Sequence, residues 1–280
     1  MKPKRSTLLK KDAFSVKGKV IIITGGIGYL GMQYAHALGN ADATVVVWDV
    51  ASPERLAAAQ QQFDRKKITV SVAAVNITDE AAVQAAVKQI LKKYSRIDGL
   101  INNAAMNPAF ESADAEKQFV PYEDYPIELW EKELKVNLTG TLICTKAVAP
   151  HMMQRKSGSI VNVASDLSVL AHNQRIYNDP KNKRFKSIAY TTTKTALVGF
   201  SRQWAARLGE YGVRVNTFSP TGVQNKNVSL DFAQRFGAVN MLGRMAQEGE
   251  YGAAVIFLCS DASSMMTGHN LVMDGGRSAW

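Results

Sequence analysis

KVIIITGGIGYLGMQYAHAL, residues 19–38, is the stretch that decides the fold of this chain. A β-branched, apolar run at 19–24 meets a glycine-rich turn, and a helical pattern follows. Gly25, Gly28 and Gly31 let the backbone approach a pyrophosphate, and a helix N-terminus supplies N–H donors and positive potential. We therefore expect a strand–turn–helix unit that binds a dinucleotide. The alternative is that the glycines only form a tight turn.

Six further β-branched runs follow along the chain: TVVVWD (44–49), ITVSVAAVN (68–76), GLINNAA (99–105), SIVNVAS (159–165), VRVNTFSP (213–220) and LVMDGG (271–276). Several are apolar without alternation, as in strands that are covered on both faces. Helical patterns lie between them, including a helix over 79–95 that Asp79 and Glu80 open, and a long helix over 126–155 that Pro126 opens. This alternation predicts the α/β class: a Rossmann-type, doubly wound domain with a seven-stranded parallel sheet and helices on both faces.

No linker divides the chain, so residues 16–280 are expected to form a single catalytic domain behind a basic N-terminal tail, 1–15. The tail lacks the apolar segment of a secretory signal, and no apolar run is long enough to span a membrane. Cys144 and Cys259 lie in apolar runs without metal-ligand spacing. We therefore predict buried, reduced thiols, no metal site and a cytoplasmic protein without a membrane segment.

The chain carries 34 basic and 24 acidic side chains, a net charge of +10 over 280 residues. Because no nucleic-acid-binding motif accompanies this charge, we expect no nucleic-acid partner. The excess favours an anionic small-molecule substrate, with a solvated basic surface as the alternative.

The second strand ends at Asp49, 18 positions after Gly31 (31 to 49). A carboxylate at this place accepts hydrogen bonds from the adenosine ribose and repels a 2′-phosphate. No Lys or Arg follows Asp49 until Arg55. The pattern therefore favours NAD(H) over NADP(H) as the cofactor.

YTTTK, residues 190–194, begins another helical stretch, and its Tyr190 and Lys194 share one helix face. A lysine beside a phenol stabilises the phenolate and lowers the tyrosine pKa. Tyr190 is therefore a candidate general acid or base. Ser165 ends the preceding strand, at the sheet edge where parallel strands present ligand-binding groups, and can bond a substrate oxygen.

These motifs, with NNAA (102–105), KVNLTG (135–140) and TGHNLVMDGG (267–276), resemble in order those of the classical short-chain dehydrogenase/reductase family, over about residues 16–280. The resemblance implies that Ser165 orients the substrate oxygen and that Tyr190 exchanges its proton. It also implies that Lys194 lowers the tyrosine pKa and holds a ribose, and that Asn137 holds a water. The expected cofactor contacts are Gly25, Gly28, Tyr29, Leu30, Asp49, Val50, Asn76, Ile77, Asn103, Ala104, Tyr190, Lys194, Pro220, Gly222 and Val223.

More narrowly, the chain resembles the bacterial flagellin-modification dehydrogenases of nonulosonate sugar pathways in four segments: TGGIGYLG (24–31), EDYPIELWEKELKVNLTG (123–140), QRIYNDP (174–180) and DGGRSAW (274–280). This resemblance implies interconversion of a secondary alcohol and a ketone on a sugar, a sugar phosphate or a nucleotide sugar. The family also implies a homotetramer, with the helix over 126–155 and the YTTTK helix at the interfaces.

Some features depart from the family pattern. Tyr29 stands at the middle glycine place, and the resulting spacing is that of members that act on nucleotide sugars. Two alternatives therefore stay open: a nucleotide-sugar epimerase or dehydratase with tightly held NAD, and a non-catalytic NAD-sensing protein. An insertion at about 166–189, with its excess at 173–186, separates Ser165 from Tyr190. Its Arg175 and Arg184 are predicted to contact an anionic substrate, unless the segment only packs on a neighbouring subunit.

Overall fold

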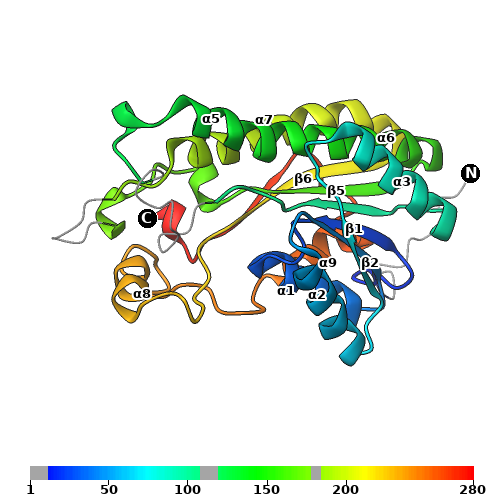
Figure 1. Ribbon diagram of the computed structural model, residues 1–280, viewed down its shortest axis with the longest axis horizontal. Coiled ribbons are helices and arrows are strands. Elements are labelled where there is room, and N and C mark those ends of the chain that lie inside the picture. The colour runs from blue at the N-terminus through cyan, green and yellow to red at the C-terminus, as the bar shows by residue number, and fades with distance from the viewer. Residues whose placement is uncertain (1–11, 108–118, 178–183) are drawn as a thin grey trace, which may run out of the picture.

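The computed structural model describes residues 12–107, 119–177 and 184–280 of the chain. It contains a seven-stranded parallel sheet in the order β3-β2-β1-β4-β5-β6-β7, which confirms the predicted fold class (Figure 1). The strands are β1 Val20–Thr24, β2 Thr44–Asp49, β3 Val70–Ala74, β4 Gly99–Asn102, β5 Gly158–Val163, β6 Val213–Pro220 and β7 Asn270–Met273.

Two layers of helices cover the sheet. One face carries α1 Tyr29–Asn40, α2 Pro53–Arg65 and α9 Gly252–Cys259, and the other carries α3 Glu80–Tyr94, α5 Ile127–Leu134, α6 Thr141–Arg155 and α7 Ile188–Leu208 (Figure 1). Successive residues of β1 explain why its run is apolar without alternation. Ile21 and Ile23 pack into the core under α1 and α9, whereas Val20 and Ile22 pack into the core under α3 and α6. The short helix α8 Leu230–Gly237 follows β6 at one end of the molecule.

The helix predicted over 79–95 is confirmed as α3. Asp79 is its N-cap, and the carboxylate accepts a hydrogen bond from the Ala82 N–H at 3.0 Å. The long helix predicted over 126–155 extends from Ile127 to Arg155, but a π-helix, η2 Lys135–Gly140, interrupts it between α5 and α6. Pro126 precedes the first turn as the N-cap residue.

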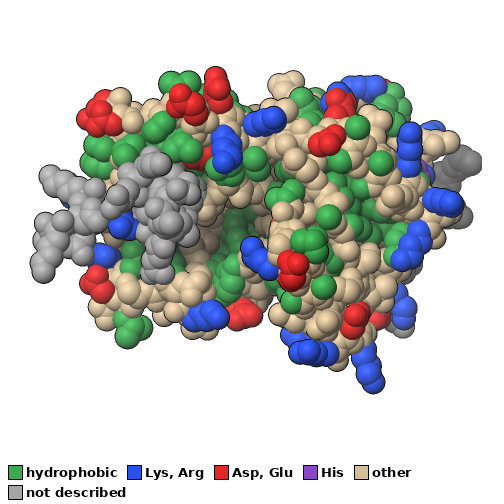
Figure 2. Space-filling model, viewed as in Figure 1, with side chains coloured by type: hydrophobic (Ala, Val, Ile, Leu, Met, Phe, Trp, Pro, Cys, Tyr) green, Lys and Arg blue, Asp and Glu red, His purple; other side chains and the backbone are tan. Residues whose placement is uncertain are grey.

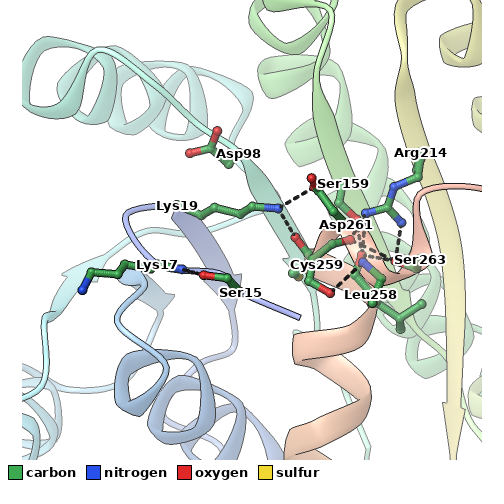
Figure 3. Close-up of polar contacts among 12 residues, drawn as sticks. Ser15, Lys17, Lys19, Asp98, Ser159, Arg214, Leu258, Cys259, Asp261 and Ser263 are labelled. Atoms are coloured by element: carbon green, nitrogen blue, oxygen red, sulfur yellow. Dashed lines mark hydrogen bonds and ion pairs between the residues drawn. The ribbon is translucent and has the colours of Figure 1, made fainter. Parts of the chain in front are cut away.

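A polar cluster at the amino ends of the strands fixes the last turn of α9 (Figure 3). Lys19, just before β1, donates to the Cys259 carbonyl at 2.8 Å. Ser159 of β5 and Arg214 of β6 donate to the Leu258 carbonyl at 2.7 and 2.9 Å. These bonds satisfy helix-end carbonyls that have no partner inside the helix. They anchor α9 at the sheet edge opposite to the carboxyl ends of the strands.

Both cysteines are buried and unpaired, as predicted, and burial raises the pKa of each thiol to about 12. Within the described parts of the chain, none of the helices has the length and apolarity that crossing a membrane requires. The expected tail, 1–15, and the expected insertion, about 166–189, fall partly on residues 1–11 and 178–183, which lie outside the described residues.

Candidate active site

A cavity of about 870 Å³ opens at the carboxyl ends of the strands. In a doubly wound parallel sheet this edge is where ligands bind. Figure 2 shows this face of the molecule hollowed between the region of α8 and the region of α1 and α2. The lining includes every residue that the sequence proposes for cofactor contact: Gly25, Gly28, Tyr29, Leu30, Asp49, Val50, Asn76, Ile77, Asn103, Ala104, Tyr190, Lys194, Pro220, Gly222 and Val223.

The glycine turn after β1 is packed too closely for side chains at two places. Gly25 has φ +61°, and a Cβ there would lie 2.7 Å from the Ala104 Cα. A Cβ on Gly31 would lie 2.4 Å from the Gly25 carbonyl oxygen. The Asn103 side chain donates to the Gly25 carbonyl at 3.0 Å and ties the turn to the end of β4. The turn therefore brings bare backbone and the N-terminus of α1 to the cavity, as a pyrophosphate requires.

Asp49 connects the end of β2 to the same turn. Its carboxylate accepts hydrogen bonds from the Val50 N–H at 2.8 Å and from the Ile27 N–H at 3.2 Å. Arg55, in the first turn of α2, also lines the cavity. A carboxylate and a guanidinium therefore line the wall where the adenosine ribose is expected. The Asp49 carboxylate favours NAD(H), whereas the Arg55 guanidinium favours the 2′-phosphate of NADP(H).

Three of the four proposed catalytic side chains come together in the cavity. Tyr190 and Lys194 project from α7, and Ser165 is the second residue after β5. Lys194 Nζ donates to the Val163 carbonyl at 2.6 Å and lies 5.6 Å from the centre of the Tyr190 ring. Ser187, the N-cap of α7, accepts from the Tyr190 N–H at 3.1 Å and donates to the buried Glu133 carboxylate at 2.8 Å. This anchored cap fixes the start of the helix that carries Tyr190.

The electrostatics around Tyr190 differ from the sequence-based expectation. Burial raises the pKa of Tyr190, the Asp166 and Glu133 carboxylates raise it further, and a hydrogen bond with Ser165 lowers it. Burial also lowers the pKa of Lys194 to about 7. The pKa of Tyr190 is therefore raised overall and not lowered as expected, because desolvation and two carboxylates dominate, and the role of Lys194 stays a prediction.

Asn137 lies in the π-helix and does not line the cavity. Its side-chain oxygen accepts from the Met106 N–H at 2.7 Å, and its amide nitrogen donates to the Thr193 hydroxyl at 3.0 Å. Thr193 precedes Lys194, so Asn137 connects α7 to the segment after β4. Its main-chain carbonyl accepts from the Thr141 hydroxyl at 2.9 Å. The water-holding role proposed for Asn137 stays a prediction.

Several charged residues that line the substrate end of the cavity were missed by the sequence analysis. Arg277, in η7 Arg277–Ala279, forms a buried ion pair with Asp166 at 2.9 Å. Lys186 precedes α7, and its ammonium lies 4.6 Å from the centre of the Tyr190 ring. Lys186 belongs to the basic insertion and Arg277 to the DGGRSAW ending, but no sequence pattern predicted that either side chain lies in the same cavity as Tyr190.

The two arginines predicted to contact substrate stand elsewhere. Arg175 is exposed in η4 Gln174–Tyr177, Arg184 is partly buried, and neither is among the residues that line the cavity. Their role as substrate contacts stays a prediction. Across the described ranges, no group of three or more His, Cys, Asp or Glu side chains is placed to hold a metal ion.

Comparison with known proteins identifies the family. Residues 24–278 match a family model described as enoyl-(acyl carrier protein) reductase. The chain is 34% identical over 269 residues to a D-threitol dehydrogenase from Mycolicibacterium smegmatis, covering 94% of each chain. It is 31% identical over 267 residues to an NAD-dependent glycerol dehydrogenase from Listeria innocua, covering 94% of this chain and 95% of the relative. The chain therefore belongs to the classical short-chain dehydrogenase/reductase family and is an oxidoreductase.

A solved structure gives the same fold with a third substrate class. The crystal structure of a gluconate 5-dehydrogenase from Burkholderia cenocepacia, in complex with NADP and tartrate, superimposes with a TM-score of 0.82 at 26% identity. The match covers 96% of this chain and 98% of that one. One relative is thus named with NAD and one structure with NADP. None of these three proteins is named as a flagellin-modification dehydrogenase, so that narrower resemblance gains no support from them.

Proposed function

We propose that the protein is an NAD(H)-dependent dehydrogenase that interconverts a secondary alcohol and a ketone on a sugar-derived substrate, a polyol or a sugar acid. One observation carries the proposal: Ser165, Tyr190 and Lys194 line the same cavity as the glycine turn and Asp49. The dehydrogenases of threitol, glycerol and gluconate among its relatives support this substrate class.

The residues present fit a dinucleotide. Gly25 and Gly31 form a cradle that a Cβ would fill, and the N-terminus of α1 follows it. These groups would hold the pyrophosphate, Asp49 the adenosine ribose, and Lys194 the second ribose. When bound, the nicotinamide supplies or accepts the hydride. The protein then has to hold the substrate carbon beside it and move one proton.

Tyr190 is the residue assigned to the proton. In ketone reduction its hydroxyl donates a proton to the substrate oxygen, and in alcohol oxidation its phenolate accepts one. Ser165 orients that oxygen by a hydrogen bond. Because its pKa is raised, Tyr190 is protonated at neutral pH and is ready to act as the acid.

NAD(H) is proposed over NADP(H) because of the Asp49 carboxylate, which the Ile27 N–H holds toward the glycine turn. A 2′-phosphate beside this group would be repelled. Arg55 on the same wall acts in the opposite direction, which makes it the natural control when the preference is measured.

A homotetramer is part of the proposal. The two helices expected at subunit interfaces carry six apolar residues that are exposed or half-buried within one chain: Leu134, Leu138, Leu142, Ala196, Phe200 and Trp204. Of these, Leu142 and Ala196 are exposed. Burying such a face against symmetry mates removes apolar area from water. Light scattering at micromolar concentration tests this, and a monomeric mass would exclude it.

The test of function is a panel of polyols, sugar acids, sugar phosphates and nucleotide sugars, each with NAD⁺ and with NADP⁺, followed by absorbance of the reduced cofactor. We expect net NADH formation with a sugar-derived alcohol, and its loss in Tyr190→Phe. Conversion of a nucleotide sugar without net NADH would instead identify the epimerase or dehydratase that the glycine spacing suggests. Dinucleotide binding without turnover of any compound would identify an NAD-sensing protein.

A further inference from the structure

Beside Tyr190, the cavity wall carries polar groups that the proton transfer does not use. His172, Lys186 and Arg277 come from three separate segments: the loop after η3 Asp166–Ser168, the residues before α7, and the C-terminal η7. Lys186 and Arg277 are 7% and 8% exposed. Long cationic side chains are rarely buried to this degree unless they are paired. Arg277 is paired with Asp166, so Lys186 is the cation that calls for a further partner.

This wall of the cavity contains buried polar nitrogens without hydrogen-bond partners. Within the described part of the chain, Arg277 Nη2 and both ring nitrogens of His172 are buried without a hydrogen-bond partner. Arg277 uses Nη1 to bind Asp166, and its guanidinium lies 4.9 Å from the centre of the Phe236 ring. The His172 ring packs against Tyr177 at a tilt of 37°, with ring centres 4.5 Å apart. A buried donor without a partner costs free energy, which a bound acceptor would recover.

The positive charges of Lys186 and Arg277 both act on His172. After burial, the largest causes that lower the pKa of His172, to about 3, are the charges of Lys186 and Arg277. His172 is therefore neutral at physiological pH and offers one N–H donor. Lys186 donates to the Asn107 side chain, and because an ammonium has three N–H donors it can also bind another acceptor.

We propose that Lys186, Arg277 and His172 form a subsite for the carboxylate of the substrate, so that the enzyme acts on sugar acids in preference to neutral polyols. The proposal rests on the proposed function and specifies its substrate class. The three donors come from three segments and line the same cavity as Ser165 and Tyr190, where the carbon that reacts must lie.

The charge balance favours a carboxylate over a phosphate dianion. Asp166 offsets Arg277 through their ion pair at 2.9 Å. Glu133 attracts Lys186 from outside the cavity lining, where Tyr125 and Ser187 bind its carboxylate. Glu133 is bound by other donors, so Lys186 contributes one positive charge to this wall of the cavity, and one negative charge on the substrate matches it.

Calorimetry on the NAD⁺-saturated protein tests the subsite by binding. The probes are matched pairs of acid and polyol with the same carbon chain: erythronate and erythritol, xylonate and xylitol, gluconate and sorbitol. We expect the acid of at least one pair to bind about ten- to hundred-fold more tightly than its polyol, the range for hydrogen bonds to charged groups. Lys186→Met should abolish this difference without changing NAD⁺ affinity, and Lys186→Arg should retain it.

A second cation provides the control. Lys88→Met changes an exposed lysine of α3 that does not line the cavity, and its affinities should equal those of the wild type. Circular dichroism and NAD⁺ binding establish that each variant is folded. If Lys186→Met does not fold, Arg277→Lys, which keeps a charge for Asp166 but loses the unpaired Nη2, takes its place.

The outcomes separate the subsite from the proposed function. If the acid and the polyol of every pair bind with equal affinity, whether weak or strong, the subsite is overturned. Tighter binding of sorbitol 6-phosphate than of gluconate also overturns it. A preference for acids that survives Lys186→Met overturns the assignment of these residues. Selective binding of acids without oxidation of any of them would retain the subsite and refute the dehydrogenase function alone.

Discussion

The charge of Asp49 gives the most direct test of the cofactor assignment. The two candidate cofactors differ by a phosphate on the adenosine ribose, and the carboxylate is fixed by N–H donors of Val50 and Ile27 at 2.8 and 3.2 Å. Two unit charges 4 Å apart interact by about 1 kcal/mol in water and by about 4 kcal/mol at the effective dielectric constant of a protein surface. Asp49 is partly exposed, so we take a value near the lower limit, about 1.4 kcal/mol, which is a tenfold preference.

The substitution Asp49→Asn keeps the size of the side chain and removes its charge. In the wild type we expect NADH to bind at least about tenfold more tightly than NADPH, and in the variant we expect the two affinities to become similar. Arg55→Ala is the matched control, because loss of the cation on the same wall should increase the preference for NADH. Fluorescence titration at two ionic strengths measures these ratios, since salt screens exposed charges. Equal affinities in the wild type, or an unchanged ratio in Asp49→Asn, would refute the reasoning.

Three further predictions follow from the site. Tyr190→Phe should lower kcat by about two to four decades with unchanged NADH affinity, whereas Lys194→Ala should lower both; near-normal turnover in either variant contradicts the assigned roles. Because burial and carboxylates raise the pKa of Tyr190, and only the phenolate accepts a proton, the rate of alcohol oxidation should rise with pH through the alkaline range, and a flat profile speaks against Tyr190 as the base. Gly31→Ala places a Cβ 2.4 Å from a carbonyl oxygen of the turn and should lower both the melting temperature and NADH affinity. Its control is Gly199→Ala, where the new Cβ meets nothing within 4 Å and the melting temperature should not fall.

The sheet could be predicted from the sequence because its signals are local. All five residues of β1 are buried, and an apolar run without alternation is what a strand between two helix layers requires. The π-helix within the helix predicted over 126–155 could not be predicted in this way. It lies where Asn137 bonds Met106 and Thr193, which are distant in sequence. Contacts of this kind exist only after the layers have assembled.

The same distinction between local signals and long-range contacts applies to the site. Residues at strand ends and on the YTTTK helix were predictable, because parallel strands present their carboxyl ends at one edge of the sheet. The ion pair between Asp166 and Arg277 joins residues 111 positions apart and has no local signature. Sequence reasoning placed the substrate cations at Arg175 and Arg184 because of their residue type, whereas the structure brings Lys186 to the cavity from the same insertion.

The charges around Tyr190 connect proton transfer with substrate choice. The Asp166 carboxylate raises the pKa of Tyr190. The same carboxylate forms the ion pair with Arg277 at the substrate end of the cavity. Lys186 lies over the Tyr190 ring, where its positive charge stabilises a phenolate. A substrate carboxylate bound by Lys186 would offset part of that charge, so oxidation of a sugar acid should need a higher pH than oxidation of a neutral polyol. A neutral polyol would leave the charge of Lys186 to favour the phenolate, which is the form that oxidises an alcohol. The charge of Lys186 would thus link the substrate proposed for this subsite to the protonation state of Tyr190.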